Sequence, residues 1–209
     1  MKLKVCGMKY VENIEQVAAL EPDYLGFIFY EKSKRNFEGI IPKIPKNIKK
    51  TGVFVNEYPE IVISLVEEYG LKALQLHGDE TPSYIENIKK HLPKVEIIKV
   101  FGIKDSFDFS KLTPYESVVD YFLFDTKGKE RGGNGVVFNW QVLSGYSSEK
   151  PFFLSGGIGL DESSVLTAFF KRDVSKKCVA IDVNSKFEIE PGLKSISKLE
   201  EFKSNLSKI

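Results

Sequence analysis

Eight short apolar runs, separated by segments with helical spacing, constrain the fold of this chain more than any other sequence feature. The runs are rich in Val, Ile and Phe, as β-strands are. Strands are therefore expected at residues 3–6, 24–29, 51–55, 73–77, 96–101, 121–125, 151–155 and 179–183. Eight units leave about 26 residues for each, which is the length of a strand and a returning helix.

The segments between the runs carry apolar stripes typical of amphipathic helices. The three clearest stripes are Val11, Ile14, Val17 and Ala18; Ile61, Val62, Leu65, Val66 and Tyr69; and Leu193, Ile196, Leu199 and Phe202. Helix-start signals add support at Thr81-Pro82 and at Asp161-Glu162.

Alternating strands and helices predict an α/β fold with a parallel sheet. Eight units that fill the chain favour a closed, eight-stranded (β/α)8 TIM barrel, with residues 1–209 as a single domain. The open doubly wound sheet is the alternative, but no G-x-G-x-x-G follows the first run.

Composition narrows the function classes. Thirty basic and 29 acidic side chains give a net charge of +1, and 42% of residues are hydrophobic, which excludes disorder and argues against a nucleic-acid partner. No apolar run approaches the ~18 residues of a membrane span, and residues 1–15 do not resemble a secretory signal. The only cysteines, Cys6 and Cys178, do not form a disulfide framework, so a cytoplasmic location is expected.

Polar side chains share one face of several strands. Because side chains alternate along a strand, each run divides into an apolar face and a second face. The second face carries Lys4 and Cys6, Gln75 and His77, Asp125, and Asp182. These residues lie toward the carboxyl ends of their strands, where barrel enzymes build active sites.

Each of these residues also has an interpretation without catalysis. Cys6 could be a small buried hydrophobe, although Lys4 on the same face is expected to lower its thiol pKa. Asp125 could be a strand-end cap, and His77 a hydrogen-bonded core histidine. Lys99, which we place on the inward face, could be structural or could form a Schiff base.

Two loops suggest phosphate binding. The sequence SGGIG at 155–159 follows the seventh run, and residues 184–192 follow the eighth, which are the usual phosphate positions in such barrels. A second glycine cluster, at 127–135, lacks the P-loop pattern and is predicted to be a mobile loop over the site.

Six motifs resemble, in order, those of the phosphoribosylanthranilate isomerase family of tryptophan biosynthesis. They are KVCGM (4–8), SKRNF (33–37), QLHGDE (75–80), FDTKGKERGGNG (124–135), FLSGGI (153–158) and IDVNS (181–185). The resemblance covers nearly the whole chain. It implies an Amadori rearrangement of N-(5-phosphoribosyl)anthranilate to the 1-amino-1-deoxyribulose phosphate, without a metal or cofactor.

The resemblance also implies roles for particular residues. It matches Cys6 to the general base, Asp125 to the general acid and Arg35 to the anthranilate carboxylate contact. It also matches His77 and Asp182 to residues that line the pocket, and Gly157 and Ser185 to phosphate-loop positions. Beside these, Gln75 is predicted to bind substrate and Gly156 to bind phosphate. On composition alone, Arg35 would be a solvated arginine in a charged stretch.

Two other functions stay open at this point. One is a Schiff-base sugar-phosphate aldolase that uses Lys99, and the other is a barrel that binds a sugar phosphate without turnover. The expected partner is a small-molecule substrate, and the chain is expected to be a monomer or a homodimer.

Overall fold

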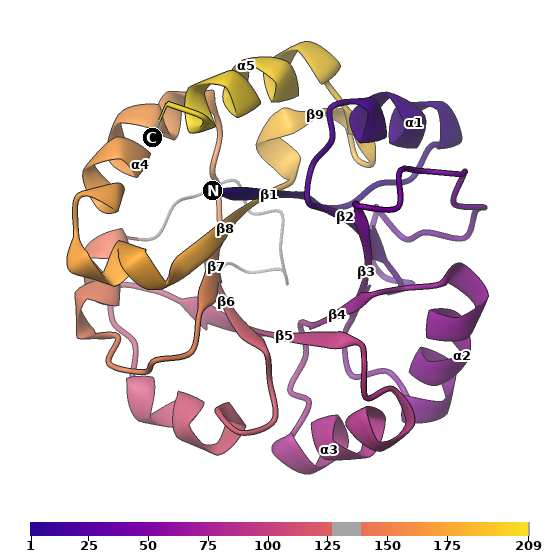
Figure 1. Cartoon of the computed structure of the whole chain (residues 1–209), viewed down its shortest axis with the longest axis horizontal. Helices are drawn as coiled ribbons and strands as arrows, with labels where there is room; N and C mark the ends of the chain where they lie inside the picture. Colours follow the sequence, from indigo (N-terminus) through magenta and orange to yellow (C-terminus); the bar gives the residue numbers. More distant parts are fainter. Residues whose placement is uncertain (127–138, 209) are drawn as a thin grey trace.

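Eight parallel strands close into a barrel in the computed structural model, which describes residues 1–126 and 139–208. Each strand pairs with the next along the chain, and β8 pairs with β1 (Figure 1). The strands are β1 (Lys2–Val5), β2 (Tyr24–Ile28), β3 (Lys49–Phe54), β4 (Ala73–Leu76), β5 (Glu96–Ile103), β6 (Tyr121–Thr126), β7 (Phe152–Leu154) and β8 (Cys178–Val183). All eight predicted strands are therefore confirmed, with ends that shift by one or two residues.

Helices surround the ring of strands, as Figure 1 shows. The α-helices are α1 (Val11–Ala19), α2 (Pro59–Tyr69), α3 (Pro82–His91), α4 (Ser163–Phe170) and α5 (Ile196–Leu206). Short 3-10 helices occur at η1 (Phe109–Tyr115), η2 (Trp140–Gly145), η3 (Leu160–Glu162), η4 (Asp173–Lys177) and η5 (Ser185–Phe187). No helix in the described ranges is long and apolar enough to cross a membrane.

The helix-start signal at Thr81 is confirmed. The Thr81 hydroxyl accepts a hydrogen bond from the Tyr84 N–H at 3.2 Å, and Pro82 occupies the first helical position.

The helical stripe predicted to begin at Leu193 is wrong at this first residue, because Leu193 lies in a strand. Pro191 and Gly192, the latter with φ +92°, reverse the chain so that β10 (Leu193–Lys194) pairs with β9 (Glu188–Glu190).

The core has the two layers of a barrel. Apolar side chains of the outward strand faces pack against the helices; Leu3, Leu74, Phe122 and Ile181 are examples. A second cluster fills the barrel interior, with Tyr24, Ala73, Ile98, Val100, Leu123, Phe153 and Ala180. The barrel interior is therefore filled by side chains. The polar residues of the inward faces lie on the side of this cluster that is nearer the carboxyl ends of the strands.

Candidate active site

A pocket opens at the carboxyl ends of the strands and is lined by residues from all parts of the chain. All nine predicted site residues line it: Cys6, Arg35, Gln75, His77, Asp125, Gly156, Gly157, Asp182 and Ser185. The predicted loop at 127–135 lies outside the described residues.

Cys6 lies at the end of β1 beside a buried ion pair. Lys4 Nζ is 2.7 Å from Asp182 Oδ1, and the Ser155 hydroxyl donates to Asp182 Oδ2 at 3.1 Å. Lys4 is fully buried and Cys6 is 4% exposed. The two charges of the pair compensate each other, which a buried lysine requires.

Lys4 acts on the Cys6 pKa in the expected direction and lowers it, but burial outweighs this effect. Burial raises the pKa of the thiol above its ordinary value, although the nearby charges of Lys4 and Lys194 act in the opposite direction. Removal from water destabilises the thiolate more than the two ammonium groups stabilise it. The free protein therefore holds Cys6 mainly as a thiol at neutral pH.

Asp125, at the end of β6, has a carboxyl group whose pKa is near neutral pH. Burial, and then repulsion from Asp182, raises its pKa from 3.8 to about 7, while the Thr126 N–H, which donates to Oδ1 at 2.8 Å, opposes the shift. Its Oδ2 atom lies 3.6 Å from His77 Nε2. Such a group holds and releases a proton in the physiological range.

Gly156 makes the close approach to Asp125 possible. Its φ is +91°, and a Cβ there would lie 2.3 Å from Thr126 Oγ1 and 3.0 Å from Asp125 Oδ1. A residue with a side chain at this position would therefore collide with the end of β6.

Arg35 is held at the pocket by a carboxylate from the β9–β10 hairpin. Its Nε and Nη2 atoms donate to both oxygens of Glu188 at 2.6 to 3.0 Å. Glu188 also accepts from Lys194 Nζ at 2.7 Å. Gly7, with φ +75°, leaves room for this arrangement, because a Cβ there would lie 2.8 Å from Arg35 Cδ.

Sequence reasoning missed Glu188 and Lys194. Lys194 is 1% exposed, and its charge acts on Cys6 as well as on Glu188. The Pro191-Gly192 turn was the available signal, since this dipeptide marks a chain reversal.

The two predicted phosphate loops meet at one side of the pocket. Gly156 and Gly157 both have positive φ and follow β7, while Ser185 begins η5 after β8. Lys186, which the sequence analysis did not single out, also lines the pocket. A cationic side chain and several backbone N–H groups therefore surround this side of the pocket.

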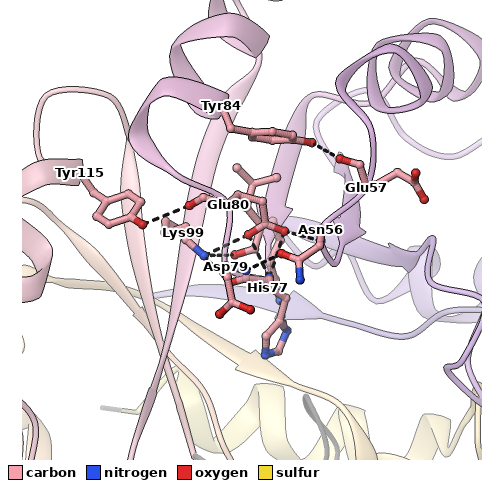
Figure 2. Close-up of polar contacts among 11 residues, drawn as sticks. Asn56, Glu57, His77, Asp79, Glu80, Tyr84, Lys99 and Tyr115 are labelled. Carbon is pink, nitrogen blue, oxygen red and sulfur yellow. Dashed lines mark hydrogen bonds and ion pairs between the residues drawn. The ribbon is translucent and has the colours of Figure 1, made fainter.

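The inward placement of Lys99 is wrong. Its neighbours Ile98 and Val100 lie in the barrel interior, so Lys99 faces the helix layer. Its Nζ atom lies 3.1 Å from Glu80 Oε2 (Figure 2). The ammonium group also lies over the rings of Phe101 and Tyr115. Lys99 does not line the pocket, so the Schiff-base aldolase has no structural support.

The described residues contain no cluster of three or more His, Cys, Asp or Glu side chains that could hold a metal ion. The pocket does contain the Asp125 carboxyl group, with a pKa of about 7, and the Cys6 thiol from another part of the barrel. It also contains the cationic side chains of Arg35 and Lys186. This arrangement suits proton transfer to and from an anionic substrate.

Comparison with known proteins identifies the family. The family model described as N-(5'phosphoribosyl)anthranilate (PRA) isomerase matches residues 3–205. The chain belongs to this family. Among curated PRA isomerases, the one from Parabacteroides distasonis is 43% identical over 208 residues, covering 97% of this chain and 91% of the relative. The one from Phocaeicola vulgatus is 38% identical, with coverage of 99% and 98%.

Solved PRA isomerase structures share the fold. The Thermotoga maritima enzyme is 29% identical with a TM-score of 0.81, and each chain is fully covered. A PRA isomerase in complex with reduced 1-(o-carboxyphenylamino)-1-deoxyribulose 5-phosphate is 26% identical with a TM-score of 0.78, again with full coverage of both chains. These barrels confirm the TIM-barrel prediction.

Proposed function

We propose that Cys6 and Asp125 act as base and acid in the isomerisation of N-(5'-phosphoribosyl)anthranilate, the activity of this family in tryptophan biosynthesis. The observation that carries the assignment is that one pocket contains a thiol and a carboxyl group whose pKa is about 7. They come from β1 and β6, which β7 and β8 separate around the ring. Acid and base can therefore reach the sugar carbons from different sides.

The reaction needs two proton transfers to reach an enaminol intermediate, and two more to form the ketose. Asp125 protonates the ring oxygen as the C1–O bond breaks, which leaves an iminium ion at C1. The Cys6 thiolate then removes the acidified C2 proton, and the electron pair forms the enamine. Protonation at C1 and loss of the proton from the C2 hydroxyl give the 1-amino-1-deoxyketose, so the step is an isomerisation without net gain or loss of atoms.

The substrate phosphate is assigned to the loops after β7 and β8. Backbone N–H groups at Gly156 and Gly157, the Ser185 hydroxyl and the Lys186 ammonium are suitable donors for an anion. The ribose then lies near Gln75, His77 and Asp182. Gln75 Oε1 is buried and has no hydrogen-bond partner among the described residues, so it is suited to accept from a sugar hydroxyl.

Arg35 is assigned to the anthranilate carboxylate. The guanidinium group can hold a carboxylate through parallel hydrogen bonds, and Glu188 fixes its plane at the edge of the pocket. Replacement of Arg35 by Met is expected to weaken transition-state binding by roughly 1.5–3 kcal/mol, the range for a hydrogen bond to a charged group. The measurement is kcat/KM, which should fall about 10- to 150-fold.

The control variant is Lys34→Met, which removes an exposed charge from the adjacent position. It should leave kcat/KM nearly unchanged. Inhibition by inorganic phosphate should also stay the same in Arg35→Met, because the phosphate contacts lie in other loops. Equal losses for substrate and phosphate, or no loss for either, would rule out a carboxylate contact.

Direct assay tests the function as a whole. Purified protein is expected to accelerate the decay of fluorescence of freshly prepared phosphoribosylanthranilate and to form the ketose product. Tight binding of the substrate without turnover would instead support the sugar-phosphate-binding barrel.

We further propose that residues 1–209 act as a single barrel domain in the cytoplasm, as a monomer or a homodimer. Two free cysteines suit a reducing compartment. One PRA isomerase of known structure, from Thermotoga maritima, is described as dimeric.

A further inference from the structure

A buried ion pair lies outside the pocket, between β5 and the loop after β4. Lys99 Nζ is 3.1 Å from Glu80 Oε2, and the side chains are 3% and 1% exposed. A buried pair contributes little net stability, because desolvation offsets the attraction between the charges. Stabilisation of the fold is therefore a weak explanation for this pair.

The contacts of the pair converge on the backbone around His77. Lys99 Nζ donates to the carbonyl oxygens of Leu76 at 3.3 Å and Gly78 at 2.8 Å, the residues on either side of His77. The Glu80 carboxylate accepts from the Gly78 N–H at 2.9 and 3.0 Å. In Figure 2 the His77 ring points away from this cluster.

The same carboxylate ties the turn after β4 to the turn after β3. Glu80 accepts from the Asn56 N–H at 2.8 Å, and Asn56 Oδ1 accepts from the Asp79 N–H at 2.6 Å. The His77 N–H donates to the Phe54 carbonyl at 2.8 Å. The backbone at His77 is thus fixed from several directions.

On the pocket side, His77 Nε2 lies 3.6 Å from Asp125 Oδ2. We infer that the Lys99–Glu80 pair is a positioning device that fixes the His77 ring opposite Asp125. This inference rests on the proposed function, in which Asp125 is the acid. Lys99 and Glu80 do not line the pocket, so they act through His77.

Lys99→Met tests the inference, because methionine keeps most of the aliphatic stem but donates no hydrogen bonds. We expect kcat to fall at least tenfold with KM changed less than about threefold, since misplacement of a group by ~1 Å can cost up to ~10²-fold in rate. The matched control is Lys89→Met, which breaks the partly exposed Lys89–Asp120 pair. It should leave kcat unchanged.

A double-mutant cycle with His77→Ala separates positioning from a general structural effect. His77→Ala is expected to lower kcat, and adding Lys99→Met should then cost less than about twofold more. Additive losses, or a His77→Ala variant with normal kcat, would overturn the inference.

Lys99→Met leaves the Glu80 carboxylate buried without its partner, which could cause misfolding, so a second variant is needed. Lys99→Met combined with Glu80→Gln removes both charges and keeps an oxygen for the Gly78 and Asn56 N–H groups. It should fold, as judged by circular dichroism, and show the same loss of kcat as Lys99→Met. Failure of both variants to fold would show that the pair is structural.

The assay of the wild-type protein distinguishes failure of the positioning role from failure of the proposed function. With an active wild type, additive losses contradict the positioning role alone. A wild type that does not convert phosphoribosylanthranilate contradicts the proposed function, and the inference with it.

Discussion

Replacement of Cys6 by Ala is expected to lower kcat by about 10²- to 10⁴-fold, the range for loss of an acid–base group. The variant should keep its fold, because the change removes one buried sulfur atom and leaves the Lys4–Asp182 pair intact. The measurement is steady-state turnover of phosphoribosylanthranilate, with circular dichroism to verify the fold.

Cys6→Ser sharpens the test, since serine keeps nearly the same size. A hydroxyl is a far weaker acid than a thiol, so it does not supply an anionic base at neutral pH. Turnover as low as that of Cys6→Ala is expected. Near-normal turnover in either variant would show that another group removes the C2 proton.

Much of the barrel could be predicted because local sequence patterns follow from its geometry. Parallel strands that alternate with helices need apolar runs of similar length, and these are what the eight segments supply. The alternation of side chains then places Cys6, His77 and Asp125 on the inward face at the carboxyl ends of β1, β4 and β6.

The face of Lys99 could not be predicted in this way. Both faces of β5 are apolar, with Ile98 and Val100 inside the barrel and Ile97 and Phe101 on the helix side. Alternation therefore does not determine which face of β5 points inward. Only the tertiary structure shows that the ammonium group meets Glu80.

Two features of the site depend on contacts between distant parts of the chain. Glu188 reaches Arg35 across 153 positions, and no periodic pattern links them. The pKa of Cys6 depends on how completely the fold removes water from the thiol. Sequence shows the neighbouring Lys4, which favours the thiolate, but it does not show the burial that outweighs it.

The raised pKa values of Asp125 and Cys6 also shape the expected pH profile of kcat/KM. Between the Asp125 pKa of about 7 and the raised pKa of Cys6, the two groups together hold one proton. The reactive form has this proton on Asp125 and a thiolate at Cys6, and it is a constant minor fraction of that population. The value of kcat/KM should therefore rise tenfold per pH unit below about 7 and level off above it.

Asp125→Asn is expected to lower kcat by about 10²- to 10⁴-fold, because the amide keeps the shape of the carboxyl group but does not transfer a proton. The break in kcat/KM near pH 7 should disappear as well. Residual activity should then rise with pH through the whole range up to the ionisation of Cys6. A break that persists near pH 7 would assign it to another group.

The same variant should be more stable than the wild type at high pH. The folded-state pKa of Asp125, about 7, lies above its ordinary value of 3.8, so the fold favours the neutral acid. Wild-type stability from this group is present below about pH 4 and is lost as pH rises toward 7. Each pKa unit corresponds to about 1.4 kcal/mol, so the asparagine variant should gain a few kcal/mol of unfolding free energy at pH 8 and less at pH 5. Urea unfolding of both proteins at the two pH values measures this difference, because groups that do not interact with Asp125 titrate alike in both proteins. An equal gain at pH 5 and pH 8 would show that the Asp125 carboxyl group does not titrate near neutrality.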